Sequence, residues 1–117
     1  MKVIVAGGRN FQDYALLEAT LLHLFSNTSP DEIEIVSGGA KGADALGEQF
    51  AKIRQMLIQR FPADWRTHGK KAGFIRNMQM AEAAECLVAF WNGSSPGTRS
   101  MIQIARSKGL RVRVIRY

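Results

Sequence analysis

The sequence predicts an α/β fold in which a parallel β-sheet is covered by helices on both faces. The first reason is that short apolar runs alternate with amphipathic segments along the whole chain. The second is that glycine-bearing turns follow several of these runs, where strands would lead into helices. The third is size: 117 residues with 46% hydrophobic content can form one core, so we expect a single domain spanning residues 1–117.

Five apolar runs have the composition of β-strands. The third is the weakest, because neither Gly nor Pro separates it from the helix before it. The last alternates arginine with valine, which is typical of an edge strand with one solvated face. The expected strands are Lys2–Ala6, Ile33–Val36, Leu57–Phe61, Leu87–Trp91 and Arg111–Ile115.

Four segments between these strands have the periodicity of amphipathic helices. In the first, Leu17, Leu21 and Leu24 share one face, and Asp13 is the expected N-cap. The polar segment Pro62–Gly73 is expected to be a long loop. The expected helices are Tyr14–Phe25, a helix from the glycine loop through Ile53, Phe74–Glu85 and Thr98–Lys108.

Composition excludes several classes of protein. No apolar run approaches the ~20 residues that a membrane span needs, and the N-terminal MKVIVAGG is too short for a signal peptide. The single cysteine, Cys86, excludes an internal disulfide and fits a reducing cytoplasm, where we expect the protein to reside. No His, Asp or Glu cluster has metal-ligand spacing, so neither a metal nor another cofactor is expected. The net charge of +6 favours anionic partners.

Three glycine-bearing loops follow the first, second and fourth expected strands, and they read GGRN, SGGAKGAD and WNGSSPGT. In open parallel sheets, ligands bind beyond the carboxyl ends of the strands, where the strand order reverses. SGGAKGAD is neither a P-loop, because Lys41 precedes Gly42, nor a dinucleotide fingerprint, because its glycines lack the required spacing. Each loop alone could be only a tight turn. Together they predict a site for an anionic ligand.

These loops, with the segments FPADW and AGFIRN, resemble the SLOG superfamily of Rossmann-like nucleotide-binding domains, especially its small YspA/YpsA-related members. The resemblance runs from VIVAGGRNF to AFWNGSSPGT and so covers essentially the whole chain. The superfamily also contains the Lonely Guy phosphoribohydrolases, which release a base from a nucleoside 5′-monophosphate, and the single-strand-DNA-loading protein of natural transformation. The resemblance implies a three-layer α/β/α sandwich, a five-stranded parallel sheet in the order 3-2-1-4-5, and a nucleotide or nucleotide-derived ligand.

Two phosphoribohydrolase motifs are matched in part. The motif of Arg, Lys, two variable residues and Met is matched by Arg76 and Met80, with Asn77 in place of the lysine. In the last motif Gly97 and Thr98 match the Gly-Thr pair, but the position of the glutamate is Met101. A thioether cannot accept a proton, so the resemblance does not extend to that family's base-release mechanism.

The candidate ligand-binding residues lie in the loops and at the helix starts. Arg9 could bind a phosphate in a forked geometry, and its alternative is a salt bridge to Asp44 or Asp64. Asp44 is a candidate ribose-hydroxyl acceptor or catalytic base, or else a structural cap at a helix start. Trp65 could stack on a base or pack over a helix end. The expected ligand contacts are Gly7, Gly8, Arg9, Asn10, Ser37, Gly38, Gly39, Lys41, Gly42, Asp44, Arg76, Asn77, Asn92, Gly93, Ser95, Gly97 and Thr98.

The favoured function is binding, with sensing as one form of it, of a nucleotide or sugar nucleotide at this edge of the sheet. One alternative is a hydrolase that cleaves an N-glycosidic or phosphate bond, with Asp44 or Asp64 as the acid–base group. The other is a single-strand nucleic-acid binder that uses the basic C-terminal segment. An exposed edge strand could also support a homo-oligomer. The basic C-terminal residues are Arg106, Lys108, Arg111, Arg113 and Arg116.

Overall fold

The computed structural model describes residues 1–117 and contains a five-stranded parallel sheet. The strands are β1 (Lys2–Gly7), β2 (Glu34–Ser37), β3 (Leu57–Arg60), β4 (Cys86–Trp91) and β5 (Arg111–Arg116). Their order across the sheet is β3-β2-β1-β4-β5, and every neighbouring pair is parallel. The predicted fold class and the predicted strand order are both confirmed.

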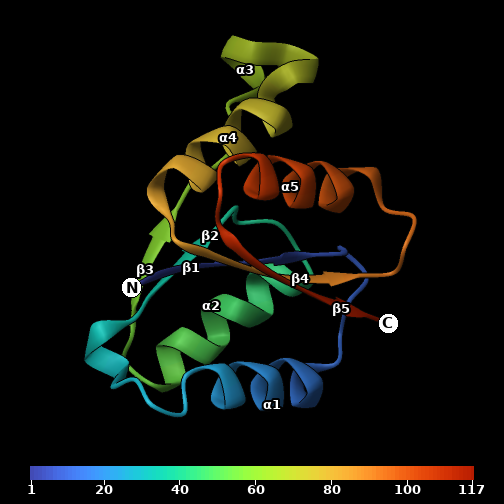
Figure 1. Ribbon diagram of the computed structural model, residues 1–117. Helices are drawn as coiled ribbons and strands as arrows, with labels where there is room; N and C mark the ends of the chain where they lie inside the picture. Colours follow the sequence, from blue (N-terminus) through green and yellow to red (C-terminus); the bar gives the residue numbers. More distant parts are fainter.

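Helices cover both faces of the sheet (Figure 1). The helices are α1 (Tyr14–Leu24), α2 (Ala43–Ile53), α3 (Trp65–His68), α4 (Ala72–Ala83) and α5 (Pro96–Ser107), with short 3₁₀ turns at η1 (Pro30–Glu32) and η2 (Gly69–Lys71). In Figure 1, α1 and α2 lie below the sheet, α4 and α5 lie above it, and α3 projects beyond the start of α4. No helix is long and apolar enough to cross a membrane.

The central strand β1 divides the core into two layers. Side chains alternate along a strand, so Val3 and Val5 pack with α1 and α2, while Ile4 and Ala6 pack with α4 and α5. All four are buried, as expected for a parallel strand that is covered on both faces. This double burial fixes the register of β1 and therefore the position of the loop that follows it.

The segment Pro62–Gly73 is not the long loop that its polarity predicts. It contains the single-turn α3 and then η2, and α4 begins at Ala72, before the predicted start at Phe74. Asp64 makes this possible, because its carboxylate accepts a hydrogen bond from the backbone N–H of Thr67 at 3.1 Å and caps α3. A four-residue helix is too short to show a hydrophobic period, so one capping side chain is its main sequence signal.

Two weak points of the sequence prediction have local explanations. The third strand is present at Leu57–Arg60, and the chain turns into it at Gln55, which adopts a positive φ of 57° without being glycine. Helix α5 begins at Pro96 rather than at Thr98, because the fixed φ of proline suits the first helical position. The last strand has the predicted edge character, since its arginines are exposed and its other residues half-buried.

Candidate ligand-binding site

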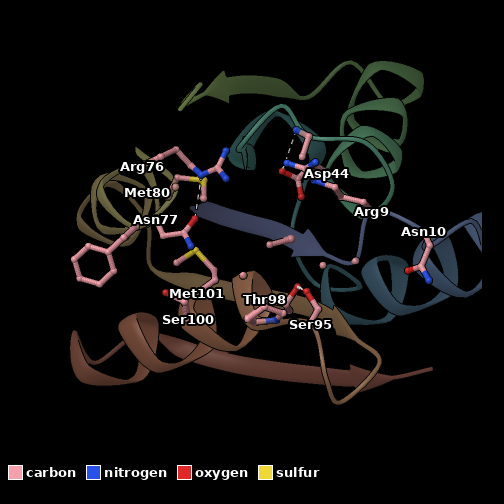
Figure 2. Close-up of a pocket in the computed structure, with 18 of the residues that line it drawn as sticks. Arg9, Asn10, Asp44, Arg76, Asn77, Met80, Ser95, Thr98, Ser100 and Met101 are labelled. Carbon is pink, nitrogen blue, oxygen red and sulfur yellow. Dashed lines mark hydrogen bonds between the residues drawn. The ribbon is translucent and has the colours of Figure 1, made fainter. Parts of the chain in front are cut away.

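A cleft of about 540 Å³ opens at the carboxyl edge of the sheet, where β1 ends (Figure 2). Strand β2 lies on one side of β1 and β4 on the other, so this is the point where the strand order reverses. The loop after β1, the start of α2, helix α4 and the start of α5 line the cleft, and Trp65 of α3 lies at its edge. The cleft is therefore where the sequence predicts an anion site.

The end of β1 and the loop after it contribute Gly7, Gly8, Arg9 and Asn10 to the lining. The backbone N–H of Gly8 donates to the carbonyl of Phe90 at 3.1 Å, which ties this loop to the end of β4. Arg9 is exposed and makes no salt bridge, so the alternative pairing with Asp44 or Asp64 is not found. Its guanidinium is therefore available to a ligand.

Asp44 is the one acidic side chain in the cleft lining, and it is buried, with 5% of its surface exposed. Its Oδ2 accepts a hydrogen bond from the backbone N–H of Ala40 at 3.3 Å. Burial raises the pKa of Asp44 from 3.8 to about 6, although Ala40 and the nearby Arg76 guanidinium act in the opposite direction. Asp44 is not a helix cap, because Gly42 occupies the N-cap position of α2.

Arg76 connects α4 to the loop after β2. Its Nη1 donates to the carbonyl of Gly38 at 2.8 Å, and its Nε donates to Oδ1 of Asn77 at 3.0 Å. Nη2 has no partner within the chain. The two bonds hold the guanidinium in one orientation at the cleft. This order reduces the entropic cost of binding a ligand. Arg76 and Asp44 lie near each other, since a Cβ at Gly38 would be 2.5 Å from Nη1 of Arg76 and 2.8 Å from Oδ2 of Asp44 (Figure 2).

The N-terminus of α5 also lines the cleft. Ser95 is the N-cap residue, but its side chain makes no capping bond and instead lies 3.3 Å from the hydroxyl of Thr98. The first-turn backbone N–H groups of Gly97 and Thr98 have no acceptor within the helix. Such uncapped N–H groups, with the helix dipole, form a favourable environment for an anion.

The glycines of SGGAKGAD mostly permit close packing and do not line the cleft. Gly42 has a positive φ of 78°, and a Cβ there would lie 2.7 Å from the Cα of Arg9. A Cβ at Gly38 would lie 2.8 Å from Oδ2 of Asp44. Gly39 and Lys41 are exposed on the outside of the loop. The loop thus brings Asp44 and Ala40 to the cleft, and Gly42 lets its backbone meet the loop after β1.

Ser37 lies beneath the loop rather than in the cleft. Its hydroxyl donates to Oε2 of Glu48 at 2.7 Å and accepts from the backbone N–H of Gly39 at 3.0 Å. Arg60 donates from Nε to the other Glu48 oxygen at 2.8 Å. Burial raises the pKa of Glu48, but the hydrogen bonds from Arg60 and Ser37 outweigh it and lower that pKa below its usual value. Glu48 therefore positions the loop through Ser37 as an ionised carboxylate.

Glu48→Ala is expected to lower the free energy of unfolding by about 1–3 kcal/mol, because the buried hydroxyl of Ser37 loses its acceptor. Urea unfolding at neutral pH measures this change. The control is Glu82→Ala: the Glu82 side chain is 61% exposed in its pair with Lys108, and the variant should change stability by less than about 0.5 kcal/mol. Equal effects of the two substitutions would contradict the positioning role of Glu48.

The other predicted residues lie outside the cleft lining. Asp64 caps α3 and borders a second cavity of about 480 Å³ with His68, and hydrogen bonds from Thr67 lower the pKa of Asp64. Asn92 accepts hydrogen bonds from the backbone N–H groups of Ser94 and Ser95 at 2.9 Å, so it shapes the turn before α5. Gly93, with a φ of 92°, packs against the Arg116 side chain.

Several lining residues were not among the predicted ligand contacts. Phe74 is the largest of those on α4, where Gly73, Asn77 and Met80 also line the cleft. Residues three and four positions apart share one face of a helix, so the spacing of Gly73 and Phe74 from Asn77 was the signal that could have found them. The remaining additions are Ala6, Ala40, Met80, Pro96, Ser100 and Met101, and the lining also contains Trp65, which the sequence suggested as a residue that stacks on a base or packs over a helix end.

No group of three or more His, Cys, Asp or Glu side chains is arranged to hold a metal ion. The fold and the cleft define a Rossmann-like α/β domain with a cleft lined by two arginines at its topological switch point. Residues 1–68 match the model of the YspA, cpYpsA-related SLOG family, YAcAr, and the chain belongs to that family. The SLOG membership predicted from the sequence motifs is confirmed.

Two known proteins resemble this chain. The Gene 61 protein of Mycobacterium phage D29 is 36% identical in an alignment that is 117 residues long. The alignment covers 95% of this chain and 93% of that protein. DNA processing protein A from Helicobacter pylori, described for its single-stranded DNA binding mode, superimposes with a TM-score of 0.70 and 18% identity. That match covers 97% of this chain and 64% of the other, so this chain corresponds to less than two thirds of the larger protein, and the likeness is one of fold.

Proposed function

We propose that the cleft binds a nucleotide or nucleotide-derived ligand through its phosphate. One observation carries this proposal: two guanidinium groups, from Arg9 and Arg76, and the uncapped N-terminus of α5 all line one cleft. Charge-assisted hydrogen bonds from arginine and backbone N–H groups at a helix start are the usual means of holding a phosphate. The ligand would lie across the end of β1, as ligands do at a switch point.

The relatives support this class of ligand. The chain belongs to a SLOG family, and a protein of the same fold, DNA processing protein A, is described as binding single-stranded DNA. Both observations favour a nucleotide or nucleic-acid partner in general terms. The choice of a phosphate-bearing ligand held in the cleft rests on the chemistry of Arg9, Arg76 and the α5 N-terminus.

We favour binding over hydrolysis because of two residues. Met101, at the position of the phosphoribohydrolase glutamate, lines the cleft and is only 1% exposed, and its thioether cannot transfer a proton. Asp64, one of two candidate acid–base groups, lies outside the cleft lining. Hydrolysis therefore depends on Asp44 alone, whose pKa of about 6 suits acid–base chemistry near neutral pH. Release of free base from a nucleotide, abolished by Asp44→Asn, would support the hydrolase instead.

The experiment that tests the proposal combines a ligand panel with an arginine variant. Saturation to about 100 times the dissociation constant should stabilise the protein by about 2.7 kcal/mol, which raises its melting temperature by several degrees. The panel is AMP, GMP, ADP-ribose, NAD, cyclic dinucleotides and inorganic phosphate. We expect stabilisation by at least one nucleotide. No rise with any of these compounds would overturn the proposal.

Arg76→Ala is expected to weaken binding of the stabilising nucleotide by about 10- to 150-fold, since it removes a charge-assisted bond of about 1.5–3 kcal/mol. Isothermal titration calorimetry measures the change. The matched control is Arg106→Ala, which removes an exposed arginine of α5 that does not line the cleft and should leave the affinity unchanged. Similar affinities for the two variants would contradict the role of Arg76.

A further inference from the structure

Two large aromatic side chains at the cleft are exposed. Trp65 is 57% exposed and Phe74 is 54% exposed, and both line the cleft. By contrast, Phe11, Phe50 and Phe90 are almost completely buried in the core. Exposed aromatic surface that borders a cavity commonly marks a binding site.

Local structure places these two side chains at the start of α4. Trp65 begins α3, whose position is fixed by the Asp64 cap, and Phe74 lies in the first turn of α4. A Cβ at Gly73 would lie 3.8 Å from Cη2 of the Trp65 ring, so the indole reaches the residue directly before Phe74. No side chain at Gly73 separates the indole from the backbone of α4.

We propose that Trp65 and Phe74 bind the nucleobase of the ligand, an inference that rests on the proposed binding of the ligand's phosphate in the same cleft. A nucleobase is flat and has apolar faces, so it stacks on indole and phenyl rings with little dependence on its identity. Phe74 and Arg76 of α4 both line the cleft, so the base-binding surface and a guanidinium that would hold the phosphate belong to the same cavity. The site therefore selects ligands that carry a base over sugar phosphates that do not.

The base could belong to a free nucleotide or to a single strand of nucleic acid. The same projecting segment carries Arg66, Lys70 and Lys71, all exposed and none lining the cleft. These cations could contact only phosphates that lie outside the cleft, as in a strand that extends beyond the bound nucleotide. They therefore provide a means to distinguish the two sources.

The test compares AMP with ribose 5-phosphate on the full chain by calorimetry. The wild-type protein is expected to bind AMP roughly tenfold or more tightly than ribose 5-phosphate, in line with the strength of base–aromatic stacking. Trp65→Ala and Phe74→Ala should each remove most of this preference and leave the affinity for ribose 5-phosphate unchanged. Trp65→Phe should retain much of the preference for AMP over ribose 5-phosphate. The control is Leu22→Ala, at an apolar residue of α1 that is 47% exposed and does not line the cleft, and this variant should retain the full preference.

The outcomes separate this inference from the proposed function. If ribose 5-phosphate binds as tightly as AMP, or if both aromatic variants bind AMP like the wild type, the inference is overturned. If in that case Arg76→Ala still weakens the binding of both AMP and ribose 5-phosphate, the proposed phosphate site is supported and the base site is not. If no phosphate-bearing ligand binds at all, both proposals are overturned.

A third variant identifies the source of the base. Lys70→Ala/Lys71→Ala should weaken binding of a short single-stranded oligonucleotide and reduce its salt dependence if the ligand is a strand, because fewer phosphates are neutralised. The same double variant should bind AMP like the wild type. If the wild type binds the oligonucleotide and AMP equally tightly, and the double variant changes neither affinity, the base belongs to a free nucleotide.

Discussion

Gly42→Ala is expected to destabilise the protein more than any other single substitution proposed for the glycine loops. A side chain at a φ of 78° costs about 1–2 kcal/mol. The added Cβ would also lie 2.7 Å from the Cα of Arg9, and backbone atoms cannot move aside as the end of a flexible side chain can. This overpacking adds about 1–3 kcal/mol. The total of about 2–5 kcal/mol is a large part of the stability of a typical domain.

Gly39→Ala is the matched control for this prediction. Gly39 has nearly the same φ, 75°, but no atom lies within 4 Å of the position of its Cβ. Its substitution should therefore cost only the conformational term of about 1–2 kcal/mol. Urea unfolding of both variants measures the difference. Equal losses would mean that the contact between the loops after β1 and β2 does not require glycine at position 42.

Asp44→Asn is expected to stabilise the protein at pH 7–8. The difference between the pKa of 3.8 in the unfolded chain and about 6 in the folded protein corresponds to about 3 kcal/mol. Because the folded state binds the proton more tightly, the stability of the wild type falls as pH rises from about 4 to about 6 and then levels off. Asparagine does not ionise, so the variant should lack this fall.

Chemical denaturation at pH 4 and at pH 8 tests the prediction. The variant's gain in stability should be near zero at pH 4 and about 2–3 kcal/mol at pH 8. Glu32→Gln, at an exposed residue of η1, is the control and should change stability by less than about 0.5 kcal/mol at both values. A gain of the same size at both pH values would show that the burial of the Asp44 charge is not its cause. A carboxylate that lowers stability in the cleft proposed to bind the ligand is the pattern expected of a functional residue.

Much of the fold could be predicted because each strand and each long helix has a local pattern of apolar residues. The continuous apolar run of β1, which is buried on both faces, and the spacing of leucines in α1 are local properties that survive in the folded protein. Helix α3 could not be predicted in this way, because four residues show no period and the helix depends on the Asp64 cap and on packing against α4. The boundary at Gln55 was also hidden, since only the folded structure holds this residue at a positive φ.

The position of the site was predictable, but the roles of its glycines were not. Parallel strands place the loops after β1, β2 and β4 at one edge, and that rule needs only the order of the elements. Whether a glycine faces a ligand or another backbone depends on residues that are distant in sequence. Gly42, for example, packs against the backbone of Gly8 and Arg9. The same holds for Ser37, whose hydroxyl is directed to Glu48 by the packing of α2 on β2.

The central place of β1 has a consequence for the folding pathway. Val3 of β1 pairs with Cys86 of β4, so the middle of the sheet joins segments that are far apart in sequence, and contacts of this kind form slowly. The cleft takes residues from the loop after β1 at one end of the chain and from α5 near the other. A fragment that ends before β4 would leave one edge of β1 unpaired and would contain only part of the cleft. During refolding, ligand binding should therefore develop with the slowest phase, after most of the helical signal has been recovered.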